Sequence, residues 1–217
     1  MNEYRETTPP VVKNLIIANC VALLAVQLLP WGNSIIEYFA LFNAESPLFR
    51  TYQVVTYMFL HGGVGHLFFN MFALWMFGRT LEFRMGSQRF FTYYMVCGIG
   101  AALLQLGVSY AEYHHALVAV GQTGAMKMLL TPTVGASGAV FGLLLAFGVL
   151  YPNQVIMLIF PPIALKAKWF VLLYGVVELF FGISGYQQGV AHFAHLGGML
   201  WGLALLWWWR KRNKIFF

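Results

Sequence analysis

The first candidate for chemistry is Ser137, a single hydroxyl in GASGAVFG (residues 135–142), where most neighbouring side chains are very small. A serine becomes a nucleophile when an adjacent base takes its proton, and histidine is the most common base. His192 and His195 lie more than fifty residues later in the chain. A catalytic role for the serine therefore requires a fold that brings one of these imidazoles to it. Gly135, which opens the stretch, is expected to help helices pack closely at this site.

Two pairs of glycines indicate how this approach could occur. Gly138 and Gly142 lie four residues apart, just after the serine. Gly198 and Gly202 follow His195 by three and seven residues, on its helical face. Small residues at this spacing allow two helices to approach closely. We expect the two glycine pairs to dock their helices so that the serine lies within hydrogen-bond reach of His195.

Two further polar residues could stabilise negative charge beside the serine. His66 and Asn70 are four residues apart, on one face of an expected helix. Both side chains can donate hydrogen bonds to an oxyanion. A serine at the start of a helix also has a backbone N–H without an intrahelical acceptor, at the positive end of the helix dipole. The pattern therefore favours acyl transfer.

The acidic residues limit the mechanism, because the chain has seven glutamates and no aspartate. A Ser-His-Asp triad is therefore impossible. Glu82 is expected at the inner end of a helix, too far from the serine, and Glu112 is expected in a loop. Glu178 falls within an apolar segment, where we expect only a hydrogen bond to a neighbouring helix. The residues predict a Ser–His dyad that acts without an acid.

The elements that must hold these residues follow from composition. Hydrophobic residues make up 60% of the 217 residues and charged residues only 9%, whereas soluble domains carry about 25% charged residues. We therefore expect an all-α integral membrane protein with a single domain over residues 1–217. Six apolar segments approach the roughly 20 residues that span a bilayer, namely 11–30, 65–83, 90–110, 135–150, 167–183 and 190–209.

The connections between these segments differ in character. Residues 31–64 interleave apolar and polar side chains, so we expect an amphipathic loop in the outer interface. His114 and His115 are expected in a solvated outer loop. Residues 155–162 are apolar but end in two prolines, and we expect an interfacial loop there rather than a seventh span.

Lysine and arginine indicate the orientation in the membrane. With the N-terminus inside, only Arg50 and Lys127 of the 13 basic residues lie outside. We expect a short cytoplasmic tail over about residues 1–12 and a basic cytoplasmic tail over residues 210–217. The net charge of +6 then faces lipid headgroups and does not indicate a nucleic-acid partner.

Three motifs resemble those of the rhomboid family of intramembrane serine proteases. HLFFNMFALWMFGRTLE (66–82) resembles the second-span pattern of His, three residues and Asn. GASGAVFG matches the family's GxSG motif, and AHFAHLGGMLWG (191–202) matches its HxxGxxxG sixth span. The motifs stand in order on the expected spans. The resemblance covers nearly the whole chain after the first dozen residues.

The resemblance implies a role for each motif residue. Ser137 would be the nucleophile, and His195 would be the general base. His66, Asn70 and the Ser137 backbone N–H would form the oxyanion hole, and Phe141 would stack on the catalytic imidazole. No cofactor and no metal are implied.

The implied activity is cleavage of transmembrane segments of other membrane proteins, within the bilayer and near its outer leaflet. The compact six-span plan is typical of bacterial members, so we expect a bacterial inner membrane with both termini cytoplasmic. The oligomeric state is left open. Tyr52 and Gln53 stand where the family often has Trp-Arg, which puts the anchoring of residues 31–64 in question.

Two other functions are compatible with parts of this pattern. A non-catalytic rhomboid-like protein would bind transmembrane helices without cutting them, although such proteins typically lack the serine or the histidine. A metal-dependent membrane hydrolase or metal transporter would use His66, His192 and His195 as ligands.

Overall fold

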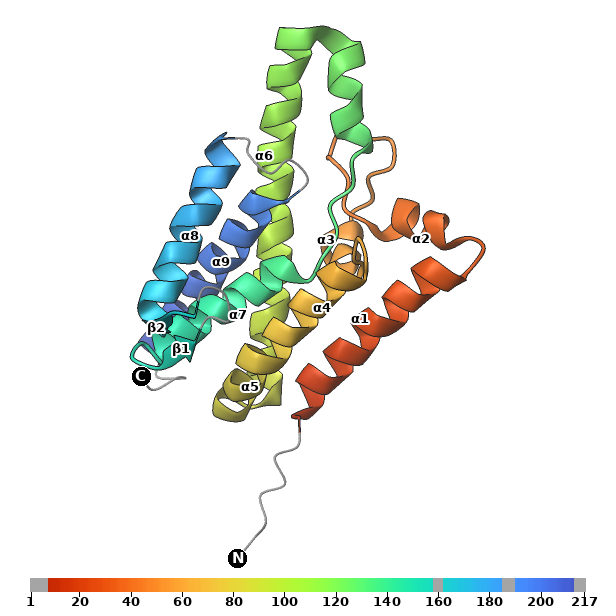
Figure 1. Ribbon diagram of the computed structural model, residues 1–217. Helices are drawn as coiled ribbons and strands as arrows, with labels where there is room; N and C mark the ends of the chain where they lie inside the picture. Colours follow the sequence, from red (N-terminus) through yellow and green to blue (C-terminus); the bar gives the residue numbers. More distant parts are fainter. Residues whose placement is uncertain (1–7, 158–161, 185–189, 213–217) are drawn as a thin grey trace, which may run out of the picture.

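Six helical segments form the bundle, and each overlaps one of the six apolar segments expected from the sequence (Figure 1). The computed structural model describes residues 8–157, 162–184 and 190–212. The chain is therefore an all-α membrane bundle, as its composition predicts. Its spanning segments are α1 (Pro10–Leu28), the consecutive helices α4 (Val64–Ala73), η2 (Leu74–Gly78) and α5 (Arg79–Met85), then α6 (Ser87–Leu130), α7 (Ser137–Leu150), α8 (Ala167–Ser184) and α9 (His192–Lys211).

The segments differ in how clearly they qualify as spans. By length and composition alone, three described helices could cross a membrane, namely α1, α6 and α8. The second segment is divided among three short helices, and α9 begins with a histidine and ends with basic residues. α7 has 14 residues and is about 21 Å long, which is less than the roughly 30 Å of a hydrocarbon core. The start of α7 can therefore lie below the membrane surface.

A buried carboxylate fixes the start of α1 to the end of the second segment. α1 begins at Pro10, slightly inside the tail expected to reach about residue 12, because the fixed φ of proline suits a helix start. The N–H groups of Val11 and Val12 donate to the Glu82 carboxylate at 3.0 and 2.8 Å. The Ser87 hydroxyl donates to the same group at 2.7 Å. Glu82 therefore has a structural role as the cap of a helix.

Gln53 organises the connection between the first two segments, which contains α2 (Gly32–Phe39), α3 (Gln53–Thr56) and η1 (Tyr57–Phe59). Its side chain is fully buried. Its Oε1 accepts from the N–H of Arg50 at 3.1 Å, and its Nε2 donates to the carbonyls of Tyr38 and Leu48 at 3.1 and 2.9 Å. The amide thus anchors the loop at the position where the resembled family often has arginine.

The third segment is much longer than expected. α6 runs for 44 residues, and its backbone turns at Gly121, whose φ of +73° lies in the left-handed region that glycine tolerates. Figure 1 shows the part after this turn folding back. The prediction of a loop around His114 and His115 is wrong, because α6 continues through both residues. His115 is exposed as expected, whereas the half-buried His114 has its ring 4.3 Å from the Tyr110 ring and its Nε2 3.6 Å from Oε1 of Glu45.

The apolar stretch expected as an interfacial loop contains strand β1 (Val155–Met157), which pairs antiparallel with β2 (Ala164–Lys166). Residues 158–161 lie outside the described residues. The hairpin places Val155 opposite Lys166 and connects α7 to α8.

α7 is the most enclosed of the spanning helices. Ten of its 14 residues are buried, and it packs against α6, α8 and α9. α1 and α8 instead expose large apolar side chains along much of their length, as expected for helices in contact with lipid. The residue that begins α7 is Ser137, so the most enclosed helix carries the candidate nucleophile.

Candidate active site

The chain reaches Ser137 through an extended stretch that other segments hold in place. Thr133 pairs with Leu41, and the N–H of each donates to the carbonyl of the other at 2.8 and 3.0 Å. The N–H of Gly135 donates to the Tyr57 carbonyl at 3.0 Å. Gly135 has a φ of +134°, which residues with a side chain rarely adopt. These contacts fix the position at which α7 begins.

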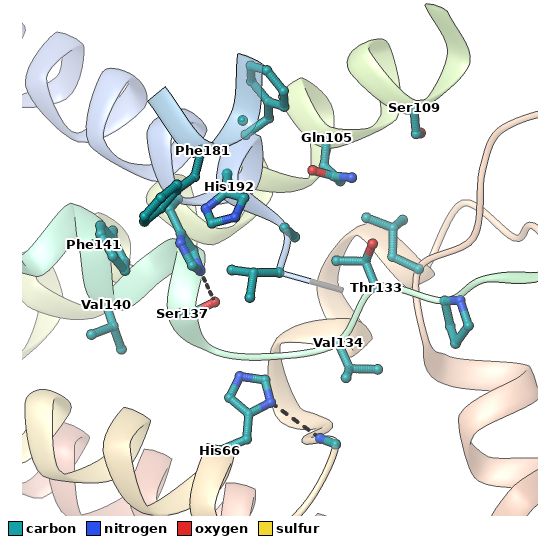
Figure 2. A pocket seen from close by; sticks show the side chains of 18 of the residues that line it. His66, Gln105, Ser109, Thr133, Val134, Ser137, Val140, Phe141, Phe181 and His192 are labelled. Carbon is teal, nitrogen blue, oxygen red and sulfur yellow. Dashed lines mark hydrogen bonds between the residues drawn. The ribbon is translucent and has the colours of Figure 1, made fainter. Parts of the chain in front are cut away.

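Ser137 and His195 lie in direct contact. The serine Oγ is 2.8 Å from Nε2 of His195, and Figure 2 shows this hydrogen bond as a dashed line from Ser137. The Phe141 ring stacks on the His195 ring at 4.2 Å between centroids, with an interplanar angle of 4°. His195 is buried, whereas the serine is half-buried. The structure thus brings together the hydroxyl, the imidazole and the aromatic ring expected from the sequence.

Glycines allow this contact, because they bring α7 and α9 together at their backbones. A Cβ on Gly198 would overlap the backbone of Gly138. A Cβ on Gly142 would lie 3.0 Å from the Gly198 carbonyl oxygen and would also overlap Cys97 of α6. The close approach expected at these three glycines is therefore present.

Two other glycines act differently from expectation. Gly202 faces α6, where a Cβ would overlap the Tyr93 hydroxyl and lie 3.0 Å from the Cys97 sulfur. Crossing helices touch closely over a limited length, so a residue one turn beyond the contact packs on a different neighbour. Gly135 does not pack helices at all: it lies in the turn before α7, where a Cβ would be 2.9 Å from Cε1 of His66.

His66 approaches the serine from the side opposite His192 (Figure 2). Its Nδ1 accepts a hydrogen bond from the N–H of Gly62 at 3.3 Å. A neutral imidazole has one donor and one acceptor nitrogen, so this contact assigns the proton to Nε2. Nε2 is also the nitrogen beside Gly135, 3.0 Å from where a Cβ would lie. His66 therefore presents an N–H toward the turn that carries Ser137.

Asn70 is buried one turn further along α4. One N–H of its amide donates to the His66 carbonyl at 2.9 Å, and a primary amide has a second N–H to donate. The backbone N–H of Ser137, at the first position of α7, has no acceptor within its own helix. His66, Asn70 and Ser137 thus each retain an N–H group that can donate a hydrogen bond.

His61 supports His66 from the preceding loop. The two rings meet edge to face with centroids 5.0 Å apart. Burial, and secondarily the charge of His66, lowers the pKa of His61 to about 4. His61 is therefore neutral at neutral pH and packs against His66 without placing a cation there.

The expectation that no acid reaches the Ser–His pair is wrong. Oε2 of Glu178 lies 2.9 Å from Nδ1 of His195 and 2.7 Å from Nδ1 of His192. The contact to His192 is a hydrogen bond, whereas the contact to His195 has the distance of an ion pair without hydrogen-bond alignment. The sequence contained a signal, since an acid within a span is rare and usually functional. It did not show that α8 turns this residue toward α9.

Glu178, His192 and His195 are also, among the described residues, a group with the side chains of a metal site. His66 is not a member of that group, so the set of three histidines considered from the sequence does not assemble. Ligand atoms around a tetrahedral ion lie about 3.3 Å apart when the bonds are near 2.0 Å. The carboxylate oxygen is closer than that to both nitrogens, so these distances fit direct contacts between the carboxylate and the two imidazoles.

A cavity of about 1260 Å³ opens beside the Ser137–His195 contact. His66 and Asn70 also line it, so all four polar side chains face one space. The hydroxyl therefore faces a space between apolar walls. Aromatic side chains from the second segment and α8 form these walls, namely Phe69, Phe72, Phe77, Phe170, Tyr174 and Phe181.

Comparison with known proteins gives one family. The model of the Rhomboid domain matches residues 48–212. The chain is 31% identical over 155 residues to Rhomboid protein 1, mitochondrial, of Saccharomyces cerevisiae, covering 71% of this chain and 41% of the relative. It is 31% identical over 147 residues to Rhomboid protease AarA of Providencia stuartii, covering 67% and 51% respectively. The chain thus spans about half, or less, of the length of these relatives.

Proposed function

The chain belongs to the rhomboid family, and on that premise we propose that it is an intramembrane serine endopeptidase. The observation that most supports the proposal is the 2.8 Å contact between Ser137 Oγ and His195 Nε2 on the wall of an open cavity. Ser137 is the nucleophile and His195 is the general base. A nucleophile and base within hydrogen-bond reach are the requirement for covalent acyl transfer.

The reaction proceeds in two steps. His195 takes the Ser137 proton at Nε2 while Oγ attacks the peptide carbonyl carbon, and the carbonyl oxygen becomes an oxyanion. The imidazolium then gives its proton to the leaving amine as the C–N bond breaks, which leaves an acyl ester on Ser137. Water, deprotonated by the same imidazole, attacks the ester carbonyl carbon. The C–Oγ bond then breaks, the imidazolium returns the proton to Ser137 Oγ, and the carboxylic acid product leaves. No cofactor takes part.

The oxyanion is held by the three N–H donors around the hydroxyl. The proton on Nε2 of His66 follows from the hydrogen bond that Nδ1 accepts from Gly62. The second amide N–H of Asn70 and the Ser137 backbone N–H supply the other two. Donors fixed in a site with little water stabilise the transition state more than the ground state.

Replacing His66 with alanine is expected to lower kcat by about 100-fold with KM within about twofold, because one oxyanion donor is lost. Asn70→Ala is expected to behave in the same way. Steady-state cleavage of a detergent-solubilised substrate measures both constants. His115→Ala removes an exposed imidazole from α6 and should leave both constants unchanged. An unchanged kcat in both His66→Ala and Asn70→Ala would remove these residues from the oxyanion hole.

The substrates are transmembrane segments of other membrane proteins, cut near the outer leaflet. The apolar walls of the cavity favour a segment that comes from lipid. A helix satisfies its own amide and carbonyl groups, so it must unwind locally before a carbonyl can be attacked. Substrates with helix-weakening Gly or Pro, and a small residue before the cut bond, therefore suit this site.

Purified full-length protein and a single-span substrate, reconstituted together in liposomes, test the proposal. We expect cleavage within or beside the span, and inhibition by a fluorophosphonate. Binding of the substrate without cleavage, under conditions where a known rhomboid protease cuts it, would favour the non-catalytic alternative. Loss of cleavage on chelation would favour the metal-dependent one.

The protein sits in the membrane as a multi-pass protein, and we place both termini in the cytoplasm of a bacterial cell, with residues 1–217 as one domain. The excess of lysine and arginine on one side supports this orientation. A green fluorescent protein fused after Phe217 is expected to fluoresce in bacterial cells, and alkaline phosphatase fused there to be inactive. The reverse pattern would place the C-terminus outside.

A further inference from the structure

Among the described residues, two acidic side chains are buried, Glu82 and Glu178. Glu82 caps α1, whereas the proposed reaction leaves Glu178 without a role. Large apolar side chains around it on α8 are exposed, including Val176, Leu179 and Phe180. The side chain of Glu178 is instead only 10% exposed and points to α9. An ionised carboxylate is costly to bury unless it is paired. The contacts that Glu178 makes with α9 must therefore offset the cost of its burial.

One oxygen of Glu178 meets two imidazoles. Oε2 lies 2.7 Å from Nδ1 of His192 and 2.9 Å from Nδ1 of His195. His195 faces Ser137 with its other nitrogen, Nε2, at 2.8 Å. Hydroxyl, imidazole and carboxylate therefore follow one another in a row, although the chain supplies them from three different helices.

The order of these contacts has a chemical consequence. To accept the serine proton at Nε2, a neutral imidazole must carry its own proton on Nδ1. A carboxylate beside Nδ1 favours that tautomer, and it stabilises the imidazolium that forms when the serine is deprotonated. Glu178 stands beside Nδ1 of His195. The stacked Phe141 ring holds the same imidazole on its face and supplies no charge.

We infer that Glu178 is a positioning residue of the proposed protease, which holds the Nδ1 side of His195 and stabilises its protonated state during acyl transfer. The inference rests on the proposed function. It replaces a Ser–His pair acting alone with a Ser–His–Glu unit, and the glutamate acts only through the histidine.

His192 holds the carboxylate in this place. Its Nδ1–H donates to Oε2 at 2.7 Å with hydrogen-bond geometry, and its ring packs against Phe181 of α8 with centroids 5.7 Å apart. It lies one helical turn before His195 on α9. The glutamate is thus fixed from two sides, by its own helix and by His192.

Glu178→Gln tests the inference, because it keeps the shape and removes the charge. An amide can donate to Nδ1 and so favour the wrong tautomer of His195. We expect kcat to fall about 10- to 100-fold with KM within about twofold. The rate at which a fluorophosphonate labels Ser137 should fall by a similar factor, and this readout needs no substrate helix. Glu178→Asp keeps the charge on a shorter side chain, so its kcat and labelling rate should lie between those of the wild type and Glu178→Gln.

Several controls separate the possible failures. Glu37→Gln makes the same change on the exposed surface of α2 and should match wild type. Thermal unfolding in detergent reports the folded fraction, to which each labelling rate is normalised.

Wild-type kcat and labelling in Glu178→Gln, with Ser137→Ala inactive, would overturn the inference and leave the proposed function intact. Wild-type cleavage by Ser137→Ala would overturn the proposed function itself. Loss of wild-type labelling on chelation, restored by zinc, would overturn the inference in favour of a metal site.

Discussion

Replacing Ser137 with alanine is expected to reduce cleavage of a reconstituted transmembrane substrate by at least about 10³-fold, to the background of the assay. In the proposed reaction, Ser137 Oγ is the protein atom that forms a covalent bond to the substrate, so no neighbouring group can replace it. Because Ser137 is half-buried and its Oγ has, among the described residues, one side-chain hydrogen bond, to His195, removal of Oγ should leave the fold intact. Initial rates of cleavage, measured with equal amounts of folded protein, provide the test.

The matched variants make this result specific. His195→Ala is expected to be about as slow as Ser137→Ala, and the double variant no slower than either, because the two residues act as one unit. Ser34→Ala removes a hydroxyl from α2 and should cut at the wild-type rate. Additive losses in the double variant would show that the two side chains act in separate steps.

Replacing Gly198 with alanine is expected to destabilise the protein by about 3 kcal/mol or more, because a Cβ there overlaps the backbone of Gly138. A flexible side chain could turn aside, but a backbone carbonyl in the middle of the α7–α9 contact cannot. The two helices must separate, and Ser137 begins one of them. We therefore also expect at least about a tenfold loss of activity per folded molecule. Thermal unfolding in detergent and labelling of Ser137 measure the two effects.

Gly107 offers the control for this substitution. It lies on α6, where a Cβ would meet nothing within 4 Å, and alanine is the better helix former by about 1 kcal/mol. Gly107→Ala should therefore unfold at the same temperature as wild type or slightly higher. If Gly198→Ala were as stable and active as Gly107→Ala, close packing of α7 on α9 would not be what positions the serine.

The sequence predicted the spanning segments and the meeting of Ser137 with His195, and both followed from strong signals. The spanning segments were predictable because they contain very few charged residues. The meeting of Ser137 with His195 was predictable because glycines four residues apart indicate a close helix contact, even when the partner helix is unknown. Gly138, Gly142 and Gly198 are the three glycines at which the two backbones come close. The expectation failed at Gly202, because the angle at which α9 crosses its neighbours is a property of the whole bundle.

The contact of Glu178 could not be predicted, because α8 is apolar on most sides and gives no periodic signal for the face turned inward. Seventeen positions also separate Glu178 from His195, so spacing on one helix does not apply. The length of α6 was missed for a related reason. Hydropathy falls after residue 110 while the helix continues, and hydropathy reports depth in the membrane rather than helical structure.

Residues 31–64 are anchored by Gln53, which stands where the family often has arginine. The sequence alone did not show whether glutamine could hold this loop. An arginine could hold loop carbonyls with its several N–H groups. Gln53 does this with two N–H donors, and its carbonyl oxygen accepts the N–H of Arg50 as well. The change from a charged to a neutral side chain thus keeps the loop attached, and the turn before Ser137 keeps its partners Leu41 and Tyr57.

Activation of Ser137 by His195 is tested most directly by mapping the site of fluorophosphonate attachment in the full-length protein by peptide mass spectrometry. We expect one adduct, on Ser137, with labelling slowed at least about 10³-fold in folded His195→Ala. An adduct on another residue, or wild-type labelling of Ser137 in His195→Ala, would contradict this expectation.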